Sequence, residues 1–274
     1  KGRLHNHTYA RNTVCFGNKS YAFNVGHYPN NYSTVTRLDY SNDGVSSTGG
    51  NIGYNRFDGA GGTGNNNYGY VGGGDITTPR THIFRYDYSN YGSNASPRSN
   101  LETSVRRMTA GGTPDYGYWV GGSTATSGNP ADSGIVSMLQ RLDYSNDTTT
   151  TSPKGPLRYN SYFCPITGTN NFGLIWNGTN YPSSPLNTTY LDYANDTTLP
   201  VIKASISEYV SNEGDGMGGT CGNNDYAWVN AASSKSNVYR FDYSNDTTTP
   251  PARGYLTSDR TAVDAASGME NGLS

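Results

Sequence analysis

A seven-residue pattern that recurs five times is the strongest constraint on this chain. It reads RLDYSND over residues 37–43 and returns, with small changes, at residues 85–90, 141–147, 190–196 and 240–246. Its first Asp stands at positions 39, 87, 143, 192 and 242, so successive copies lie 48, 56, 49 and 50 residues apart. A period near fifty residues indicates one supersecondary unit copied along the chain, rather than a single irregular core.

Each repeat has four segments in the same order. A small-residue segment ending in Gly comes first, at residues 11–17, 56–62 and 106–112 in the first three repeats, and a polar turn follows it. An aromatic segment with period-two alternation comes second and starts at residues 21, 68, 116, 172 and 226. The third segment runs into the repeated Asp. The fourth is rich in Thr and ends near Pro, as at residues 148–153, 197–200 and 247–251.

Four short strands in a unit of this length predict a propeller blade. We therefore expect an all-β propeller with five blades of four antiparallel strands and essentially no helix; a six-bladed ring is the alternative. One domain would cover residues 1–274, with repeats near 1–50, 51–99, 100–153, 154–202 and 203–252 and a partial sixth repeat over 253–274. The loop between the second and third segments varies most in length and is longest in repeat three, from Ser123 to Ile135. Such loops are the expected place for function.

The chain contains one first segment more than five blades need. Residues 8–17 and residues 260–268 both have this character. A propeller is expected to close by pairing the two chain ends in one blade, because an open ring leaves exposed strand edges. Only one copy can take the inner position, so we expect the C-terminal copy to contact other subunits of an assembly.

Composition excludes several classes of function. A net charge of −2 with 15% charged residues argues against a nucleic-acid partner, which requires a basic surface. No apolar run is long enough to span a membrane. Cys15, Cys164 and Cys221 are odd in number and widely spaced, which favours buried free thiols over a disulfide framework.

The repeated pattern itself has two interpretations. Side chains of Asp, Ser and Asn can bind nearby backbone groups and hold a turn, which gives a structural role to Asp39, Asp87, Asp143, Asp192, Asp242, Asn42, Asn90, Asn146, Asn195 and Asn245. A calcium loop is the alternative, since these side chains offer hard oxygens. Repeat two carries Tyr91 where the others have the last Asp, which removes a ligand. We therefore expect a structural turn, with no metal and no cofactor.

Two kinds of residue are candidates for carbohydrate chemistry. Rings stack on the apolar faces of sugars and amides bond their hydroxyls, which makes Tyr28, Asn31, Tyr32 and Tyr181 candidate glycan contacts. Asn-X-Ser/Thr sequences mark candidate N-glycosylation sites at Asn6, Asn18, Asn31, Asn94, Asn146, Asn177, Asn187, Asn195 and Asn245. Sequences of this kind also arise by chance in a chain rich in Asn, Ser and Thr. No nucleophile elbow, phosphate-binding loop or dinucleotide fingerprint is present.

The order of segments resembles the kelch repeat. That family pairs a strand ending in a Gly doublet with a strand that carries a large residue just before Asp. Here the pairs are residues 70–73 (YVGG) with Tyr86-Asp87, and residues 119–122 (WVGG) with Leu142-Asp143. The family's Trp in the fourth strand is missing, and the doublet is degraded in repeats one, four and five. The resemblance implies a divergent kelch-like propeller.

The repeated sequence Asp-Tyr-Ser-Asn-Asp-Thr, together with the Gly-Tyr strands, also resembles repeat proteins of aquatic bacteriophages. Those proteins are thought to be components of tail fibres or appendages. This resemblance covers nearly the whole chain and implies a non-enzymatic structural or adhesive module, extracellular or on a virion, that contacts host-surface glycans. A secreted or cell-surface microbial glycoprotein that forms filaments is the first alternative. A carbohydrate-active propeller enzyme is the second, because two carboxylates distant in sequence can meet in space.

Overall fold

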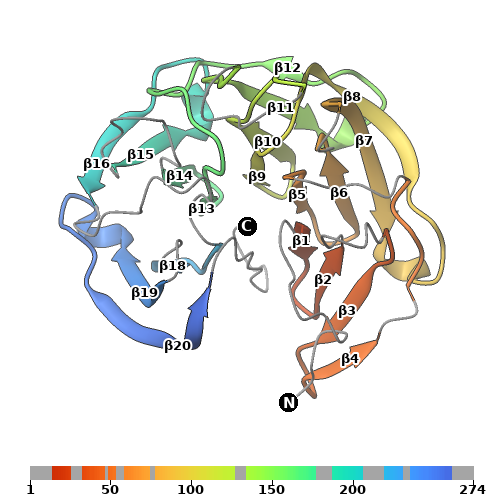
Figure 1. Cartoon of the computed structure of the whole chain (residues 1–274), viewed down its shortest axis with the longest axis horizontal. Coiled ribbons are helices and arrows are strands. Elements are labelled where there is room, and N and C mark those ends of the chain that lie inside the picture. The colour runs from red at the N-terminus through yellow and green to blue at the C-terminus, as the bar shows by residue number, and fades with distance from the viewer. Residues whose placement is uncertain are drawn as a thin grey trace.

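The protein is an all-β propeller of five blades, as predicted. The computed structural model describes residues 14–25, 33–46, 49–53, 59–74, 78–126, 134–176, 187–205, 219–230 and 235–260. These residues form five sheets of four strands, and all the strand pairs are antiparallel. The sheets stand around a common axis, with the first strands nearest the centre (Figure 1). Among the described residues the only helical segments are 3-10 turns of three residues.

Each blade uses four strands that are consecutive in the chain. Blade 1 contains β1 (Val14–Gly17), β2 (Tyr21–Val25), β3 (Thr36–Asp39) and β4 (Gly44–Ser46). Blade 2 contains β5 (Gly61–Gly64), β6 (Tyr68–Gly72), β7 (Arg80–Asp87) and β8 (Ser96–Val105). Blade 3 contains β9 (Thr109–Gly112), β10 (Tyr116–Val120), β11 (Leu139–Asp143) and β12 (Ser152–Pro153). Blade 4 contains β13 (Ile166–Gly168), β14 (Phe172–Trp176), β15 (Asn187–Asp192) and β16 (Val201–Ser205). Blade 5 contains β17 (Thr220–Gly222), β18 (Tyr226–Asn230), β19 (Lys235–Asp242) and β20 (Ala252–Arg260).

One register holds in all five blades. The aromatic residue that begins the second strand lies opposite the repeated Asp, in the pairs 21–39, 68–87, 116–143, 172–192 and 226–242. Large and small residues alternate in the second strand because neighbouring blades pack closely against it. A Cβ added to Gly69 in β6 would lie 2.3 Å from the ring of Phe16 in blade 1, so the small residue makes room for the neighbouring blade.

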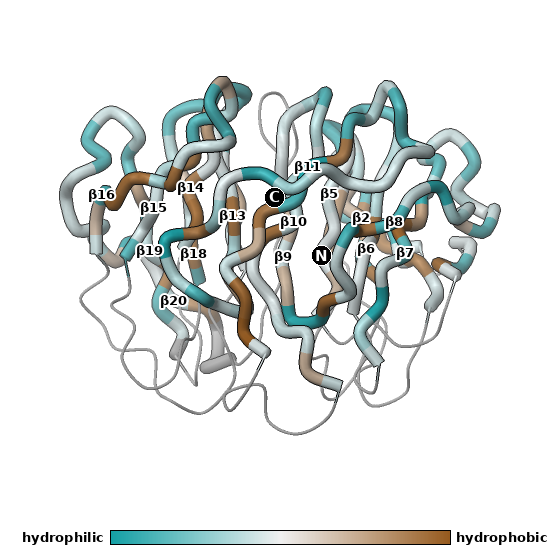
Figure 2. The backbone as a smooth tube through the Cα atoms, turned by 90° about the horizontal axis from the view of Figure 1, so that it is seen from above, coloured by the Kyte–Doolittle hydropathy of each residue, from teal (hydrophilic) through white to brown (hydrophobic). Residues whose placement is uncertain are grey.

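The core lies between the blades. Four clusters of buried apolar side chains fill the junctions of blades 1 and 2, 2 and 3, 3 and 4, and 4 and 5. Trp119 and Trp176 are the largest fully buried side chains among the described residues. Hydrophobic colour accordingly marks the middle of the strands, and hydrophilic colour marks the turns along the upper rim (Figure 2).

Blade 1 faces blade 5 near Tyr40. Tyr40, in the repeat turn of blade 1, is half-buried and interacts electrostatically with the thiols of Cys15 in β1 and Cys221 in β17. Burial raises the pKa of this tyrosine to about 12, and the two thiols act in the same direction.

The first strand of blade 2 and the fourth strands of blades 3 to 5 differ in position from the prediction. The first strand of blade 2 is β5, not residues 56–62, because Gly64 rather than Gly62 precedes the turn that corresponds to Asn18. The Thr-rich segments were expected to be fourth strands. In blades 4 and 5 the fourth strands begin only after them, at Val201 and Ala252, and in blade 3 only Ser152–Pro153 of the segment is strand.

The Thr residues close the repeat turn instead. The hydroxyls of Thr149, Thr198 and Thr248 donate to the backbone carbonyls of the turn Asn residues at 2.9–3.0 Å. Their strand propensity is outweighed by this local hydrogen bond.

The chain ends do not share a blade in the described part of the structure. Blade 1 takes its inner strand from β1, so the N-terminal copy of the first segment occupies the inner position. The fourth strand of blade 5 extends to Arg260, and the remaining residues of the predicted sixth first strand lie outside the described ranges.

All three cysteines are free. Cys164 is buried, and Cys15 and Cys221 are half-buried. No helix in the described part of the chain is long and apolar enough to cross a membrane.

Candidate functional site

The repeated Asp residues hold the turns that follow the third strands. In every blade the Asp carboxylate accepts a hydrogen bond from the backbone N–H two residues later, at 2.9–3.0 Å. Where that residue is Ser, its hydroxyl donates to the same oxygen at 2.7 Å. These bonds lower the pKa of Asp39 and Asp242. The carboxylate acts as the N-cap of a short 3-10 turn in blades 2 to 5.

The turn Asn residues contribute through their backbone rather than their side chains. In blades 3, 4 and 5 the Asn carbonyl accepts the N–H three residues later, from Thr149, Thr198 and Thr248. Side-chain bonds within the turn are made by Asn42, which accepts from Gly44, and by Asn146, which accepts weakly from Thr148. The side chains of Asn146, Asn195 and Asn245 are exposed.

The last Asp of the repeat joins one blade to the preceding one. Asp147 of blade 3 is 5% exposed and accepts from the Tyr70 hydroxyl at 2.9 Å, from Arg85 at 2.8 Å and from Arg98 at 3.0 and 3.1 Å, all in blade 2. Burial alone would raise the pKa of this carboxyl, but the bonds from Arg98 and Tyr70 and the charge of Arg85 lower it below its usual value. A buried carboxylate is therefore fully paired at this junction.

Asp196 repeats the arrangement between blades 4 and 3. It accepts from the Tyr118 hydroxyl at 2.9 Å and from Arg141 at 2.7 Å, with Lys154 at 3.6 Å. The junction of blades 2 and 1 uses a different pair. There Phe23 replaces the hydroxyl-bearing Tyr, and Tyr91 replaces the Asp.

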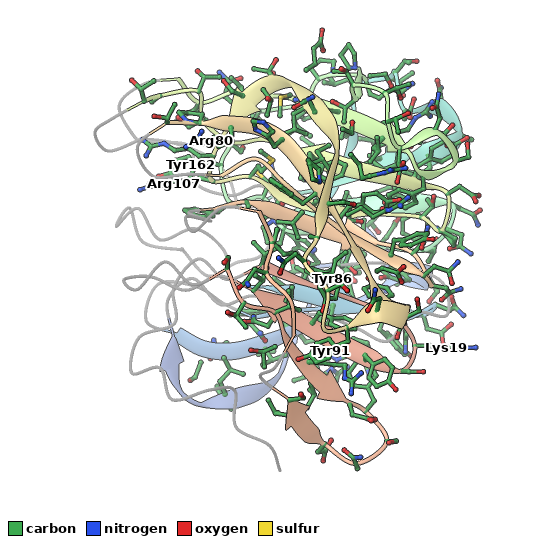
Figure 3. All side chains as sticks on the ribbon, turned by 90° about the vertical axis from the view of Figure 1, so that its right-hand side faces the viewer. Lys19, Arg80, Tyr86, Tyr91, Arg107 and Tyr162 are labelled. Atoms are coloured by element: carbon green, nitrogen blue, oxygen red, sulfur yellow. The ribbon has the colours of Figure 1, made fainter. Side chains whose placement is uncertain are left out.

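The Tyr91 hydroxyl donates to the Ser46 carbonyl of blade 1 at 2.6 Å, and the Val35 carbonyl lies 3.2 Å from the same hydroxyl. The change from Asp to Tyr91 in repeat two, which removes a possible metal ligand, is thus matched by the change from Tyr to Phe23 in the neighbouring blade. In Figure 3, Tyr91 lies beside Tyr86, whose hydroxyl donates to the Tyr91 carbonyl.

These contacts engage the carboxylates of the repeat. Asp147 and Asp196, the last Asp of their repeats, bind cationic side chains. Asp39, the first Asp of its repeat, binds its own turn. These contacts occupy the oxygens that a calcium ion would need. Among the described residues, no three His, Cys, Asp or Glu side chains gather in a group that could hold a metal.

A pocket between blades 2 and 3 is a candidate ligand site in the described part of the chain. Its volume is about 470 Å³, within the range of ligand sites. Its walls come from β8, from the start of β11 with the residues before it, and from the segment after β12. β12 has two residues whereas β8 has ten, so blade 3 lacks a full outer strand here (Figure 1). Ile135, at the end of the long repeat-three loop, is part of the lining.

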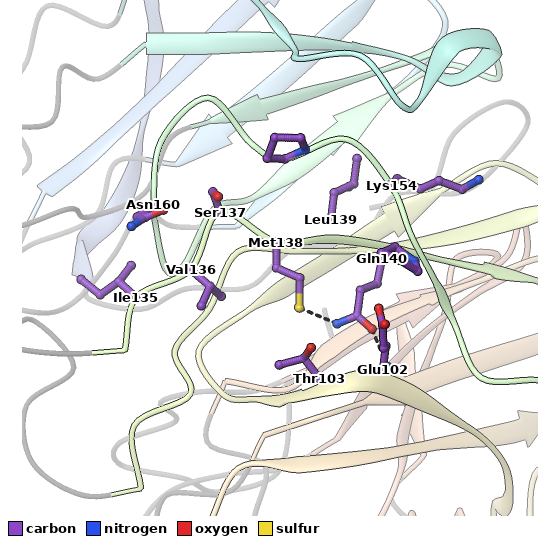
Figure 4. Close-up of a pocket in the computed structure, with 12 residues that line it drawn as sticks. Glu102, Thr103, Ile135, Val136, Ser137, Met138, Leu139, Gln140, Lys154 and Asn160 are labelled. Atoms are coloured by element: carbon purple, nitrogen blue, oxygen red, sulfur yellow. Dashed lines mark hydrogen bonds between the residues drawn. The ribbon is translucent and has the colours of Figure 1, made fainter.

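The pocket is lined by apolar groups and several hydrogen-bonding side chains (Figure 4). Gln140 is 1% exposed, and its carbonyl oxygen accepts from the Glu102 backbone and the Thr151 hydroxyl, each at 2.6 Å. Its amide nitrogen donates to the thioether of Met138, so the side chain holds the wall of the pocket in place. Glu102 and Asn160 are exposed at the pocket. Glu102 is the single carboxylic acid among the lining residues.

Arginines and aromatic rings form a second group, away from Lys19. Figure 3 shows Arg80, Arg107 and Tyr162 together at the opposite end of the molecule from this lysine. Arg107 and Phe163 both have positive φ, 55° and 50°, and the Phe163 N–H donates to the Arg107 carbonyl at 2.8 Å. Backbone in this region is costly for residues with a Cβ and clusters at functional sites. No sequence motif marks this group, because its members come from separate repeats.

Some of the residues predicted to contact or carry sugars lie outside the described part of the chain, and the others have defined surroundings. The candidate contacts Tyr28, Asn31, Tyr32 and Tyr181 lie outside the described residues, as do Asn6 and Asn177. Asn18 is half-buried and uses both ends of its amide, accepting from Ser20 and Tyr21 and donating to Asn66. Asn94 is exposed, and its oxygen accepts from the Asn51 backbone. Asn187 is 9% exposed and accepts from Ser205 at 2.7 Å.

Comparison with known proteins gives no family. The chain matches no known protein-family model, and no curated protein shows significant similarity to it.

Proposed function

We propose that this propeller is a non-enzymatic structural and adhesive module that works outside the cell and contacts glycans. The pocket between blades 2 and 3 carries the proposal. Its exposed Asn160 amide and Glu102 carboxylate offer donors and acceptors of the kind that bind sugar hydroxyls. Its volume suits one or two sugar rings.

The same pocket argues against hydrolysis. Hydrolysis of a glycosidic bond generally needs two carboxyl groups on either side of that bond. Among the described lining residues Glu102 has no second carboxylic acid beside it, and the buried Asp147 and Asp196 are paired with Arg side chains. The ligand would therefore be held rather than cleaved.

Two settings suit such a module. The resemblance to phage repeat proteins supports a virion tail-fibre or appendage component, and the kelch-like order of segments supports a divergent kelch-type propeller. A secreted or cell-surface microbial glycoprotein, assembled into filaments, is the second candidate. Three exposed Asn residues at equivalent positions of the repeat turns favour it.

A glycan array tests the proposed pocket. We expect the full chain to bind a limited set of glycans, and Glu102→Gln and Asn160→Ala each to weaken binding about tenfold, the effect of losing about 1.4 kcal/mol. Asn224→Ala, an exposed change in a strand turn of blade 5, is the matched control and should bind normally. Binding that survives both pocket changes would remove this pocket as the site. Release of sugar by the unmodified chain, abolished by Glu102→Gln, would show an enzyme instead.

A further inference from the structure

The repeat turns of blades 3, 4 and 5 each present an Asn in the sequence Asn-Asp-Thr. We propose that Asn146, Asn195 and Asn245 are acceptors for N-linked glycans, and that Asn18 and Asn187 are not. The five positions share the same short sequence signal, so only their surroundings separate them. The distinction rests on what each side-chain amide does in the folded chain.

The three proposed acceptors have amides that the fold does not use. All three are exposed and lie at the end of a 3-10 turn. The turn is held by the Asp N-cap and by the Asn backbone carbonyl. One side-chain bond is present at these positions, a weak bond of 3.5 Å that Asn146 accepts through its oxygen from Thr148. A glycan on the amide nitrogen would therefore break no bond of the turn.

The two excluded positions are built into the fold. Asn187 lies in β15 with its amide oxygen bound to Ser205, and its neighbours Thr188 and Thr189 are at most 1% exposed. A sugar there would hold the strand away from its sheet. The Asn18 amide donates to the carbonyl of Asn66 in blade 2 and caps its own turn with its oxygen. A sugar on this nitrogen would displace the bond between blades 1 and 2.

The Thr two places after each acceptor Asn is also not used to close the turn. Thr148, Thr197 and Thr247 are exposed, whereas the turn bond is made by the next residue, for example Thr149 to the Asn146 carbonyl at 3.0 Å. Blade 2 keeps the 3-10 turn without this Thr, because Gly92 stands at its place and the Ser93 N–H donates to the Asn90 carbonyl at 2.9 Å. The turn therefore does not depend on the Thr two places after the Asn. The glycosylation sequence, in contrast, requires that Thr.

The transfer needs a lipid-linked oligosaccharide as co-reactant. The Asn amide nitrogen forms a bond to the anomeric carbon of the first sugar, and the bond from that carbon to the lipid phosphate oxygen breaks. The phosphate leaves with the electron pair, and the amide nitrogen loses one proton. Such a reaction belongs to a secretory route, so it favours the surface-glycoprotein setting over the virion.

The test is site-resolved mass spectrometry of the full chain secreted from a eukaryotic host. An appended terminal peptide with its own acceptor sequence reports that the host is competent. We expect glycans at Asn146, Asn195 and Asn245, and none at Asn18 or Asn187 in the folded, secreted fraction. Thr148→Ala should remove the glycan at Asn146 and leave the unfolding temperature of the deglycosylated protein unchanged.

Thr149→Ala is the matched control. It should keep the glycan at Asn146 and lower the unfolding temperature, because it removes the hydroxyl that closes the turn. The proposal fails if the three turn positions are empty while the appended acceptor is occupied. It also fails if folded, secreted protein carries a glycan at Asn187.

Discussion

Removing the Asp147 carboxylate should destabilise the propeller far more than removing Asp43, its counterpart in blade 1. Asp147 is 5% exposed and binds Tyr70, Arg85 and Arg98 of the neighbouring blade, whereas Asp43 is exposed and makes no ion pair with the residues that the structure describes. Breaking a fully buried ion pair costs about 3–5 kcal/mol, and leaving the Tyr70 hydroxyl unpaired adds about 1 kcal/mol. Water can reach the two Arg side chains, which are 25% and 32% exposed, and this reduces the cost.

We therefore expect Asp147→Ala to lower the free energy of unfolding by about 2–4 kcal/mol, and Asp43→Ala by about 0.5 kcal/mol or less. For a chain of this size the first change corresponds to a fall of roughly 5–10 °C in unfolding temperature. Urea unfolding monitored by tyrosine and tryptophan fluorescence and by circular dichroism measures both, provided that the two probes give the same transition.

A double-mutant cycle separates the hydroxyl bond from the rest. Tyr70→Phe alone should cost about 1 kcal/mol, and the same change in the Asp147→Ala background should cost nothing, because the hydroxyl has already lost its acceptor. If Asp147→Ala and Asp43→Ala destabilise equally, or if Tyr70→Phe costs the same in both backgrounds, the inter-blade role of Asp147 is refuted.

Three further predictions follow from the same contacts. Asp143→Ala should cost about 0.5–2 kcal/mol through loss of the N-cap and leave glycan binding unchanged; lost binding at an unchanged unfolding temperature would reverse this assignment. The lowered pKa of Asp147 contributes stability that is complete above the unfolded-state pKa of about 3.9 and is lost as the pH falls through the folded-state pKa. The urea midpoint should thus fall on acidification less steeply in Asp147→Ala than in the unmodified chain, and equal slopes would contradict it. Gly121→Ala should destabilise by more than about 1 kcal/mol, since φ is +65° and a Cβ would lie 2.4 Å from the Ser161 carbonyl oxygen, while Gly92→Ala meets no atom within 4 Å and should be nearly neutral by thermal unfolding.

The sequence by itself determined the architecture. The fivefold recurrence of one turn, with an aromatic strand before it, was enough to predict five blades of four strands, because each blade repeats the same local hydrogen bonds. The Asp N-cap is a contact across two residues, and the 21–39 register places the first aromatic opposite that Asp. Local chemistry of this kind is readable from residue types and their spacing.

The tertiary structure alone decided what the last residue of each copy does. Asp147 and Asp43 follow the same Tyr-Ser-Asn sequence, yet one is buried against the cations of another blade and the other is exposed. Tyr70 and Asp147 at the junction of blades 2 and 3 correspond to Phe23 and Tyr91 at the junction of blades 1 and 2. This paired change cannot be recognised without knowing that the two residues of each pair meet across a junction. The pocket is of the same kind, because β8 and the short β12 form its walls only after blades 2 and 3 pack together. Contacts between residues some fifty to eighty positions apart depend on how adjacent blades pack, and local sequence does not encode that packing.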